Sequence, residues 1–384
     1  MTDGMRFETT AIHVGQDPDP ETGSAIVPIY QTSTYVQQAV GVHRGYEYSR
    51  TDNPTRRALE TCLASLEPAS HAVAFASGMA ATTTLALTLS KGDRVLIPND
   101  VYGGTYRLFS KVTANLGLEF TALDMTDIPS VRKALEDGRV KLLFTETPTN
   151  PTLHVLDLDA LGSLAREFET LFVVDNTFAT SYIQRPVDFG ADAVVYSATK
   201  YLGGHSDLVA GAITTNDDAL AEKLRFLQNA AGGVPGPFDC WLLLRGLKTL
   251  AMRMRAHSEG AALVAHWLHD HPGVEHVYFP GLESFPGHEV AAKQMSAAGE
   301  PLFGGMVSFT VESKARALDI CERTELFWLG ESLGGVESLI EYPAVMTHAS
   351  LAGSGMEVPD TLIRLSVGIE HPDDLIADLD QALA

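Results

Sequence analysis

Short apolar runs alternate with amphipathic stretches from about residue 59 to residue 250. The apolar runs are rich in β-branched residues, which is typical of buried strands. Helical patterns lie between most of them, for example over 79–89 and 158–168. This alternation predicts an α/β domain with a mostly parallel sheet covered by helices on both faces. The expected strands are 72–75, 94–97, 119–123, 141–145, 171–175, 193–197 and 209–214.

The pattern changes after this region. A long helix rich in Leu, Ala, Met and Arg is expected over 239–270, and the Pro272–Gly273 pair ends it. Shorter elements follow, including a strand over 306–311 and a final acidic helix over 372–384. These elements predict a smaller C-terminal α/β domain.

The first part of the chain has no clear period and contains several prolines and glycines. A long irregular segment in a compact protein is expected to be functional or to pack on something else, such as a neighbouring subunit. The chain is therefore divided into an N-terminal arm (1–58), a large domain (59–255) and a small domain (256–384).

Two charged residues lie at the ends of apolar strands in the large domain. Lys200 lies in the segment 197–207, SATKYLGGHSD, and Asp175 ends the run that begins at Leu171. Ligands of parallel sheets bind at the carboxyl ends of strands, so both side chains are expected at one site. A lysine that forms a Schiff base and an aspartate that keeps a pyridine nitrogen protonated suit pyridoxal phosphate (PLP). A buried Lys–Asp ion pair is the structural alternative.

Four further segments carry side chains that suit such a cofactor, and each has a structural alternative. Gly78 opens a helix after a strand, where backbone amides bind phosphate, although Ser-Gly also serves simple turns. Tyr48 and Arg50 lie in the arm, where the arginine could bind a phosphate or be merely exposed. Tyr102 could stack on a flat ring or fill the core. Asn150 could reach the cofactor's phenolic oxygen or form a Pro-Asn turn.

Arg364 is a lone charge in the apolar run 363–368. A charge in such surroundings requires an anionic partner. That partner could be the α-carboxylate of a substrate or a carboxylate of the protein.

Charge and cysteine content narrow the classes of partner. The net charge of −22 argues against nucleic acid and against an anionic membrane surface. Cys62, Cys240 and Cys321 are far apart and form no CxxC, so free thiols in a reducing cytoplasm are expected. No metal site is predicted. The uncharged stretch 72–90 is interrupted by a Ser-Gly pair and fits a strand, a turn and a buried helix better than a membrane span. A GxGxxG motif after an early strand, which a dinucleotide-dependent oxidoreductase requires, is missing.

These segments together follow the order found in one family. The chain resembles the Cys/Met-metabolism family of PLP enzymes, related to cystathionine γ-lyase and cystathionine γ-synthase, over nearly its whole length. The motifs that carry the resemblance are YSRTDNPTR (48–56), ETPTNP (146–151), VDNTFA (174–179), SATKYLGGHSD (197–207) and ESLGGVESL (331–339).

The resemblance implies a PLP-dependent fold type I enzyme that assembles as a homotetramer, a dimer of dimers. It implies that Tyr48 and Arg50 reach the cofactor phosphate of the neighbouring subunit, which would account for the arm. Lys200 matches the Schiff-base lysine, Asp175 the pyridinium partner, and Tyr102 the stacking ring, which could also serve as a second acid–base group. The other cofactor positions expected are Gly78, Met79, Asn150, Thr177, Ser197 and Thr199, and the expected substrate positions are Arg107, Glu331, Ser332 and Arg364.

Departures within the family bear on the reaction. The turn after Tyr102 has glycines where methionine γ-lyases carry a cysteine, and the segment MTHAS (346–350) lacks the arginine typical of homoserine sulfhydrylases. Glu331 looks like the glutamate of cystathionine γ-enzymes and could attract the distal amino group of cystathionine. Methionine γ-lyase and homoserine sulfhydrylase are therefore less favoured.

The segments 238–250 and 360–370 resemble the lyases slightly more than the synthases. The prediction is therefore a cystathionine γ-lyase, which would cleave L-cystathionine to L-cysteine, 2-oxobutanoate and ammonia by α,γ-elimination. The alternative is a cystathionine γ-synthase, which would replace the γ-substituent of an O-acylhomoserine by cysteine.

Overall fold

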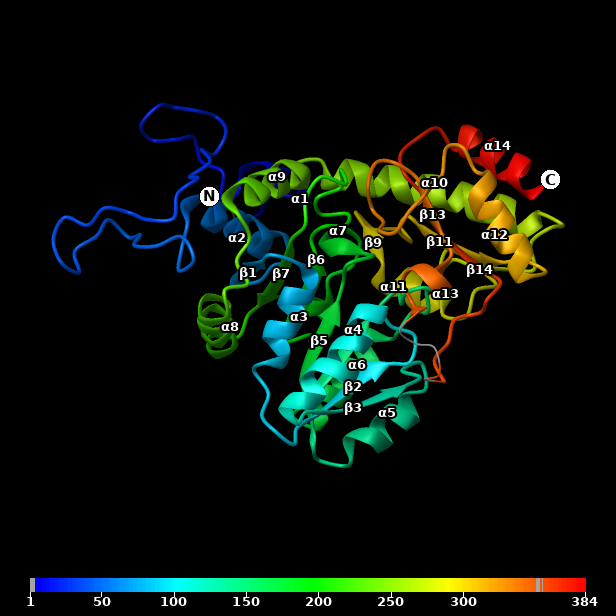
Figure 1. The fold of residues 1–384 in the computed structure, drawn as a ribbon, viewed down its shortest axis with the longest axis horizontal. Helices are drawn as coiled ribbons and strands as arrows, with labels where there is room; N and C mark the ends of the chain where they lie inside the picture. The colour runs from blue at the N-terminus through cyan, green and yellow to red at the C-terminus, as the bar shows by residue number, and fades with distance from the viewer. Residues whose placement is uncertain (1–3, 350–352, 354) are drawn as a thin grey trace.

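A seven-stranded sheet forms the centre of the larger part of the chain in the computed structural model, which describes residues 4–349, 353 and 355–384 (Figure 1). Its strand order is β1-β7-β6-β5-β4-β2-β3. Neighbouring strands from β3 to β6 pair in parallel, and β7 alone runs antiparallel to both of its neighbours. The expected mostly parallel sheet is confirmed. The strands are β1 (His71–Phe75), β2 (Arg94–Pro98), β3 (Glu119–Leu123), β4 (Val140–Glu146), β5 (Leu171–Asp175), β6 (Ala193–Ser197) and β7 (Gly211–Thr215).

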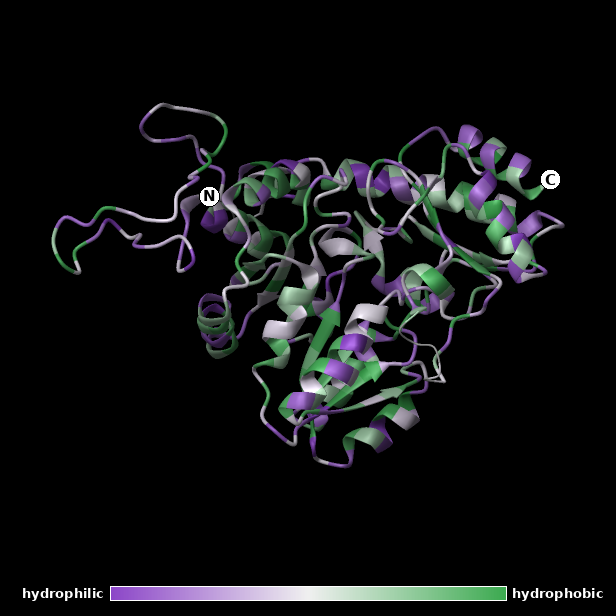
Figure 2. Cartoon of the chain, in the orientation of Figure 1, coloured by the Kyte–Doolittle hydropathy of each residue, from purple (hydrophilic) through white to green (hydrophobic). Residues whose placement is uncertain are grey.

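The central strands are buried because they carry apolar residues on both faces of the sheet. Phe172, Val173 and Val174 of β5 are all fully buried, although consecutive side chains point to opposite faces. Figure 2 shows the central strands as mainly hydrophobic and the outer helices as mixed. The helices of this part are α2 (Pro54–Leu66), α3 (Gly78–Ala86), α4 (Gly103–Arg107), α5 (Ile128–Leu135), α6 (Leu158–Glu167), α7 (Thr180–Ile183) and α8 (Asp218–Ala231), with η1 (Leu108–Val112), η2 (Thr113–Leu116) and η3 (Pro186–Phe189).

The expected strand over 209–214 begins two residues later, at Gly211. Ala210, the residue before Gly211, is bonded to Thr199. The backbone N–H of Thr199 donates to Ala210 O, and the Thr199 hydroxyl accepts from Ala210 N. The backbone around Ala210 is therefore bonded to the turn that carries Lys200 instead of to β6.

The prediction of a single helix over 239–270 is wrong. The structure has two helices, α9 (Pro237–Leu247) and α10 (Leu250–Asp270), with Thr249 outside the helical conformation. Gly246 packs so closely against Gly203 that a Cβ would lie 2.3 Å from Gly203 O, and Arg253 Nη2 donates to Gly246 O. The break thus comes from a contact with the Lys200 turn, far away in sequence.

A second sheet lies in the C-terminal part, beside α10 (Figure 1). Its order is β12-β13-β14-β11-β8, and the expected strand over 306–311 and the final helix are both present. The elements are β8 (His276–Tyr278), β11 (Met306–Thr310), β12 (Trp328–Leu329), β13 (Leu339–Glu341) and β14 (Leu362–Ser366), with α11 (His288–Gln294), α12 (Lys314–Arg323), α13 (Pro343–Met346), α14 (Pro372–Leu383) and the small pair β9 (Ser296–Ala297) and β10 (Glu300–Pro301).

The N-terminal segment extends away from the sheets as long loops (Figure 1). After α1 (Phe7–His13) it has no helix and only isolated bridges until α2. Val36 and Val40 in these loops are almost fully exposed. The division of the chain into arm, large domain and small domain stays a prediction.

The uncharged stretch 72–90 forms β1, a turn and α3, as expected. Among the described residues, no helix is both long enough and apolar enough to cross a bilayer. Ser350, the last residue of the segment MTHAS, lies outside the described residues.

Candidate active site

A cavity of about 290 Å³ lies where the ends of β4, β5 and β6 meet the N-terminus of α3 and the C-terminal sheet. It brings together twelve of the residues expected at the site. These are Gly78, Met79, Tyr102, Asn150, Asp175, Thr177, Ser197, Thr199, Lys200, Glu331, Ser332 and Arg364. The sequence analysis missed eight others that line the same cavity: Ser77, Thr82, Thr105, Glu146, Phe178, Val209, Leu333 and Thr347.

Lys200 points its amine at the C-terminal part of the chain. Its Nζ donates to Ser332 Oγ over 2.6 Å, and no ion pair with Asp175 is found among the described residues. Burial and the positive charge of Arg364 together lower the pKa of Lys200 to about 8, while the charges of Glu341 and Glu331 act in the opposite direction. The amine is therefore poised to lose its proton near neutral pH.

Ser332, the partner of Lys200, has a strained backbone. Its φ of 99° lies in the region that favours glycine. A non-glycine residue held there costs about 1–3 kcal/mol and is found most often at functional sites. The strain places its hydroxyl on Lys200 and its carbonyl on Arg364, whose Nη2 donates to it over 2.9 Å.

Asp175 ends β5 and is bonded locally. Its Oδ1 accepts from the backbone N–H of Thr177 over 3.0 Å and from the Thr177 hydroxyl over 2.5 Å. Thr177 Oγ1 in turn accepts from Ser197 N over 2.9 Å, which ties the ends of β5 and β6 together. Burial raises the pKa of Asp175 to about 6, while the two bonds from Thr177 act in the opposite direction. A buried carboxylate of this kind suits a positively charged partner such as a protonated pyridine nitrogen.

Glu146 is a site residue that the sequence analysis did not single out, although it opens the motif ETPTNP. It pairs with Asp175 across β4 and β5 and accepts from Tyr102 N at 3.2–3.3 Å. Burial, together with the charge of Asp175, raises the pKa of Glu146 well above its usual value. Its position at a strand end, like that of Asp175, was the signal available in the sequence.

The N-terminus of α3 forms a cradle next to the end of β6. Ser77 caps the helix by accepting from Ala80 N over 3.0 Å. A Cβ on Gly78 would lie 2.8 Å from Ser197 Cβ, so the glycine allows this close approach. Free backbone amides beside the hydroxyls of Ser197 and Thr199 are groups that bind a phosphate.

The sequence left open whether Arg364 has an anionic partner within the protein, and the structure shows one. It lies opposite Glu341 in the β13–β14 register, and the exposed fractions of Arg364 and Glu341 are only 2% and 1%. Arg364 Nη2 lies 3.0 Å from Glu341 Oε2, and Nη1 donates to Asn150 Oδ1 over 2.8 Å. Asn150 thus uses its side-chain oxygen to hold Arg364, which also lines the cavity.

Three expected site residues lie outside the cavity. Tyr48 and Arg50 line a separate hollow in the arm, and Arg50 Nη1 donates to the backbone and side-chain oxygens of Asn229 over 2.6 and 3.0 Å. Arg107 does not line the cavity either, but its charge lowers the pKa of His348. Within the described residues, no cluster of three potential metal ligands is found.

The sequence profile described as Cys/Met metabolism PLP-dependent enzyme matches residues 8–384. The chain belongs to this family. Among its relatives, the cystathionine γ-synthase of Mycobacterium tuberculosis is 53% identical over 98% of this chain and 96% of its own length. The cystathionine β-lyase of Coxiella burnetii is 50% identical, and the cystathionine γ-lyase of Dictyostelium discoideum is 49% identical, each over 98% of this chain and 97% of the relative.

Solved structures agree with this assignment. The crystal structure of metB from Corynebacterium glutamicum superimposes with a TM-score of 0.97 at 47% identity, over 100% of this chain and 99% of that one. A cystathionine γ-synthase from Xanthomonas oryzae pv. oryzae, in complex with aminoacrylate and cysteine, gives 0.94 at 40% identity, over 99% and 98%. The fold is therefore that of the PLP-dependent fold type I enzymes, and the protein is a PLP-dependent trans-sulfuration enzyme.

The cavity fits the cofactor of this family. The amine of Lys200 has a lowered pKa, Asp175 supplies a buried carboxyl, and the cradle at Gly78 offers backbone amides to a phosphate. Tyr102 lines the same cavity. These four features make up a site for an aldehyde, a basic ring nitrogen, a phosphate and a flat ring, which are the parts of PLP.

Proposed function

We propose that this enzyme makes cystathionine by replacing the γ-substituent of an O-acylhomoserine with cysteine, as a cystathionine γ-synthase. The observation that carries this choice is that four mycobacterial relatives, at 52–53% identity, are named cystathionine γ-synthase. Relatives named β-lyase and γ-lyase are 49–50% identical. The sequence segments 238–250 and 360–370 favoured the γ-lyase, which remains the second candidate at the same site.

Lys200 is the residue proposed to move protons. PLP, when bound, withdraws electrons from the substrate's α-carbon and so acidifies its α-proton. An amine with a pKa near 8 can accept that proton and return it nearby. The 2.6 Å bond to Ser332 Oγ fixes where the amine lies between transfers.

The other side chains are proposed to orient the reactants. With the cofactor bound, Asp175 would pair with its ring nitrogen, and Tyr102, whose backbone N–H donates to Glu146, would stack on its ring. Arg364 binds the α-carboxylate of the substrate. Glu331, which also lines the cavity, attracts an amino group on the distal end of the substrate.

Both candidate reactions remove a γ-substituent, and they differ in the fate of the remaining carbon skeleton. In the synthase reaction, the cysteine thiol adds at Cγ and gives cystathionine. In the lyase reaction, water releases the skeleton, and the products are 2-oxobutanoate and ammonia. Cleavage on the other side of the sulfur, at Cβ, would give pyruvate instead of 2-oxobutanoate.

A product assay distinguishes these reactions. The purified holoenzyme is given cysteine with O-succinyl- or O-acetylhomoserine in one reaction and cystathionine in another. We expect cystathionine formation to be the faster reaction, with 2-oxobutanoate as the minor product of cleavage. Rapid release of 2-oxobutanoate from cystathionine with little synthesis would instead establish the γ-lyase, and release of pyruvate would contradict both candidates.

We further propose that the enzyme works in the cytoplasm as a homotetramer in which Tyr48 and Arg50 complete the phosphate site of a neighbouring subunit. Three free and buried cysteines support a reducing compartment. The distance of the arm from its own cavity and its exposed apolar side chains support the exchange between subunits.

A further inference from the structure

Arg253 is a buried arginine of α10 whose hydrogen bonds go to backbone carbonyls of other segments. Its exposed fraction is 4%. Nη1 donates to Tyr201 O over 2.6 Å, and Nη2 donates to Gly246 O over 2.8 Å. Nη2 also makes a longer contact of 3.5 Å with Leu202 O. The guanidinium therefore lies on the turn that directly follows Lys200.

The charge of Arg253 is held by neutral groups. Nε donates to Thr249 Oγ1 over 3.1 Å, and in the described part of the chain no acidic side chain is found to pair with the guanidinium. Burial lowers the pKa of Arg253 to about 10, so the side chain stays charged at neutral pH. Burying a charge without a counter-charge is costly, so packing alone would favour an apolar side chain here. The bonded carbonyls are the feature that requires an arginine.

The carbonyls after Lys200 are bonded one after another. Those of Lys200 and Gly204 accept from backbone N–H groups over 2.8 and 3.1 Å. The two carbonyls that lie between them in this turn and face α10, at Tyr201 and Leu202, accept from Arg253. A buried carbonyl that loses its donor is destabilised. Without the guanidinium, the backbone on this side of Lys200 would therefore be released.

Two glycines allow the contact between α10 and this turn. A Cβ on Gly204, whose φ of 74° favours glycine, would lie 2.0 Å from Arg253 Nη1. A Cβ on Gly246 would lie 2.9 Å from Leu202 O, the carbonyl that Arg253 also contacts. Both positions thus leave the space that the close approach needs.

The same face of α10 also reaches the other side of the cavity. His257, one turn after Arg253, packs its ring edge-on against the Tyr201 ring, with the ring centres 5.1 Å apart. His257 Nδ1 lies 2.7 Å from the carbonyl oxygen of Val367, which directly follows β14, the strand of Arg364. In Figure 1, α10 runs along the C-terminal sheet, and it contacts β8 and β11 there. The helix thus links the lysine turn to the strand of the proposed carboxylate anchor.

We propose that Arg253 is a positioning residue for Lys200. By holding the carbonyls of Tyr201 and Leu202, it fixes the backbone from which the lysine amine reaches the α-carbon of a bound amino acid. A reacting group misplaced by about 1 Å can slow a reaction by about 100-fold. Removing the guanidinium should therefore slow proton transfer more than it weakens binding. The inference rests on the proposed role of Lys200 as the group that moves protons.

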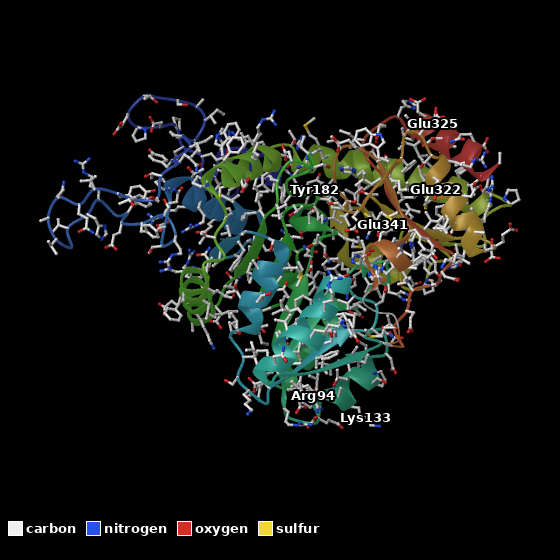
Figure 3. The ribbon with its side chains drawn as sticks, in the orientation of Figure 1. Arg94, Lys133, Tyr182, Glu322, Glu325 and Glu341 are labelled. Atoms are coloured by element: carbon white, nitrogen blue, oxygen red, sulfur yellow. The ribbon has the colours of Figure 1, made fainter. Side chains whose placement is uncertain are left out.

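Two variants and a matched control test this. Arg253→Met keeps a long side chain without donors, and Arg253→Lys keeps the charge but can reach fewer carbonyls. The control is Arg255→Met, which removes an arginine of the same helix that contacts α7 instead of the lysine turn. Arg255 Cζ lies 5.6 Å from the centre of the Tyr182 ring, which Figure 3 labels. The unfolding temperature and PLP affinity of each variant are measured first.

The first measurement uses the apoenzyme and needs no cofactor. Amide hydrogen–deuterium exchange of the peptide that contains residues 201–206 is followed by mass spectrometry. We expect exchange at least about tenfold faster in Arg253→Met than in wild type, a smaller increase in Arg253→Lys, and no change in Arg255→Met. This result decides whether Arg253 holds the turn even if the proposed role of Lys200 fails.

The second measurement follows exchange of the α-protons of glycine in D2O by NMR, with the PLP-loaded enzyme. Glycine has no γ-substituent, so this rate does not depend on which γ-reaction the enzyme catalyses. At saturating glycine we expect the rate to fall by about 30-fold or more in Arg253→Met and by about fivefold in Arg253→Lys. The dissociation constant of glycine, read from the cofactor absorbance, should stay within about twofold of wild type, because Arg253 makes no contact with the cavity.

Two results would overturn the inference. One is amide exchange at the wild-type rate in Arg253→Met, which would show that the turn does not depend on the guanidinium. The other is a fall in α-proton exchange matched by an equal loss of glycine affinity, which a merely structural role would give. If Arg253→Met does not fold, Arg253→Lys carries both measurements, and wild-type values in it would count against the inference in the same way.

Discussion

At the scale of single residues, the site depends on what burial does to a few charged groups. The sequence identified Lys200 and Asp175 because their strand-end positions are visible as patterns. It left their pairing open, and the structure separates them: Lys200 bonds to Ser332 and Asp175 to Thr177. Glu146 was missed although its strand-end position was visible in the sequence, whereas the importance of Glu341 arises from Arg364 on the adjacent strand, which no local pattern reveals.

The lowered pKa of Lys200 predicts how the apoenzyme captures its cofactor. Only the unprotonated amine attacks the aldehyde, so the rate of PLP uptake should rise with pH up to about 8 and level off above it. An ordinary lysine would keep gaining rate up to about pH 10. Stopped-flow absorbance after mixing apoenzyme with PLP gives the profile, with Lys200→Ala as the inactive control. A rate still rising steeply above pH 9 would contradict the burial effect.

Asp175 is expected to destabilise the folded apoenzyme at neutral pH although the reaction requires it. Its folded-state pKa of about 6 is above the unfolded value, so the stability it contributes is present at low pH and is lost as the pH rises through 6. The loss corresponds to about 3 kcal/mol. Asp175→Asn should therefore make the apoenzyme more stable than wild type in urea at about pH 8 but not at about pH 4.

The same variant should lose activity, because a neutral amide does not hold a proton on the ring nitrogen. We expect turnover of the PLP-loaded Asp175→Asn enzyme to fall by about 100-fold or more, with Asp175→Glu less affected. Equal urea stability of wild type and variant at about pH 8 would show that Asp175 is not strained by burial.

At the scale of elements, the alternation of strands and helices was predictable and their contacts were not. The hydrophobic pattern predicted all seven strands of the large sheet, with bounds that lie within about two residues of those observed. The break between α9 and α10 was not visible, since it results from Gly246 meeting the Lys200 turn and from Arg253 binding the Gly246 carbonyl. A contact between segments far apart in sequence overrode a strong helical pattern.

Because α3 lies very close to β6 at Gly78, a larger residue at this position should weaken cofactor binding. In Gly78→Ala the new Cβ would lie 2.8 Å from Ser197 Cβ, so the helix N-terminus must move away from the phosphate site. We expect PLP to bind at least about tenfold more weakly, measured by equilibrium dialysis. Gly233→Ala is the matched control, because its Cβ would meet ordinary contacts at 3.7–3.8 Å. Equal PLP affinity in the two variants would exclude the α3 cradle as the phosphate site.

At the scale of the whole molecule, residues from both sheets line the cavity, and residues of the arm do not. The arm extends away from the two sheets (Figure 1). The sequence and its family resemblance anticipated most of the cavity wall, including Glu331, Ser332 and Arg364 from the C-terminal part. Within one chain, Tyr48, Arg50 and Arg107 are not on that wall. The assembly proposed from the arm therefore needs its own test.

Arg50 should matter for cofactor binding only between subunits. In Arg50→Ala, the fold of one chain loses the hydrogen bonds to Asn229 and the contact with the Tyr48 ring, all at exposed positions, so its unfolding temperature should change little. Its affinity for PLP should fall by about tenfold if the arginine binds a neighbour's phosphate. The control is Arg57→Ala, which removes another arginine of this region that pairs with Asp52. Light scattering gives the number of subunits, and a monomer with full PLP affinity would exclude the exchange.

The central claim is that the Lys200 cavity holds the cofactor, and chemical trapping tests it most directly. The purified enzyme is reduced with borohydride, digested, and its peptides are mapped by mass spectrometry. The account predicts that PLP is fixed on the peptide containing Lys200 and that its yellow absorbance is lost. PLP fixed on a different lysine, or none fixed on a protein supplied with excess PLP, would contradict it.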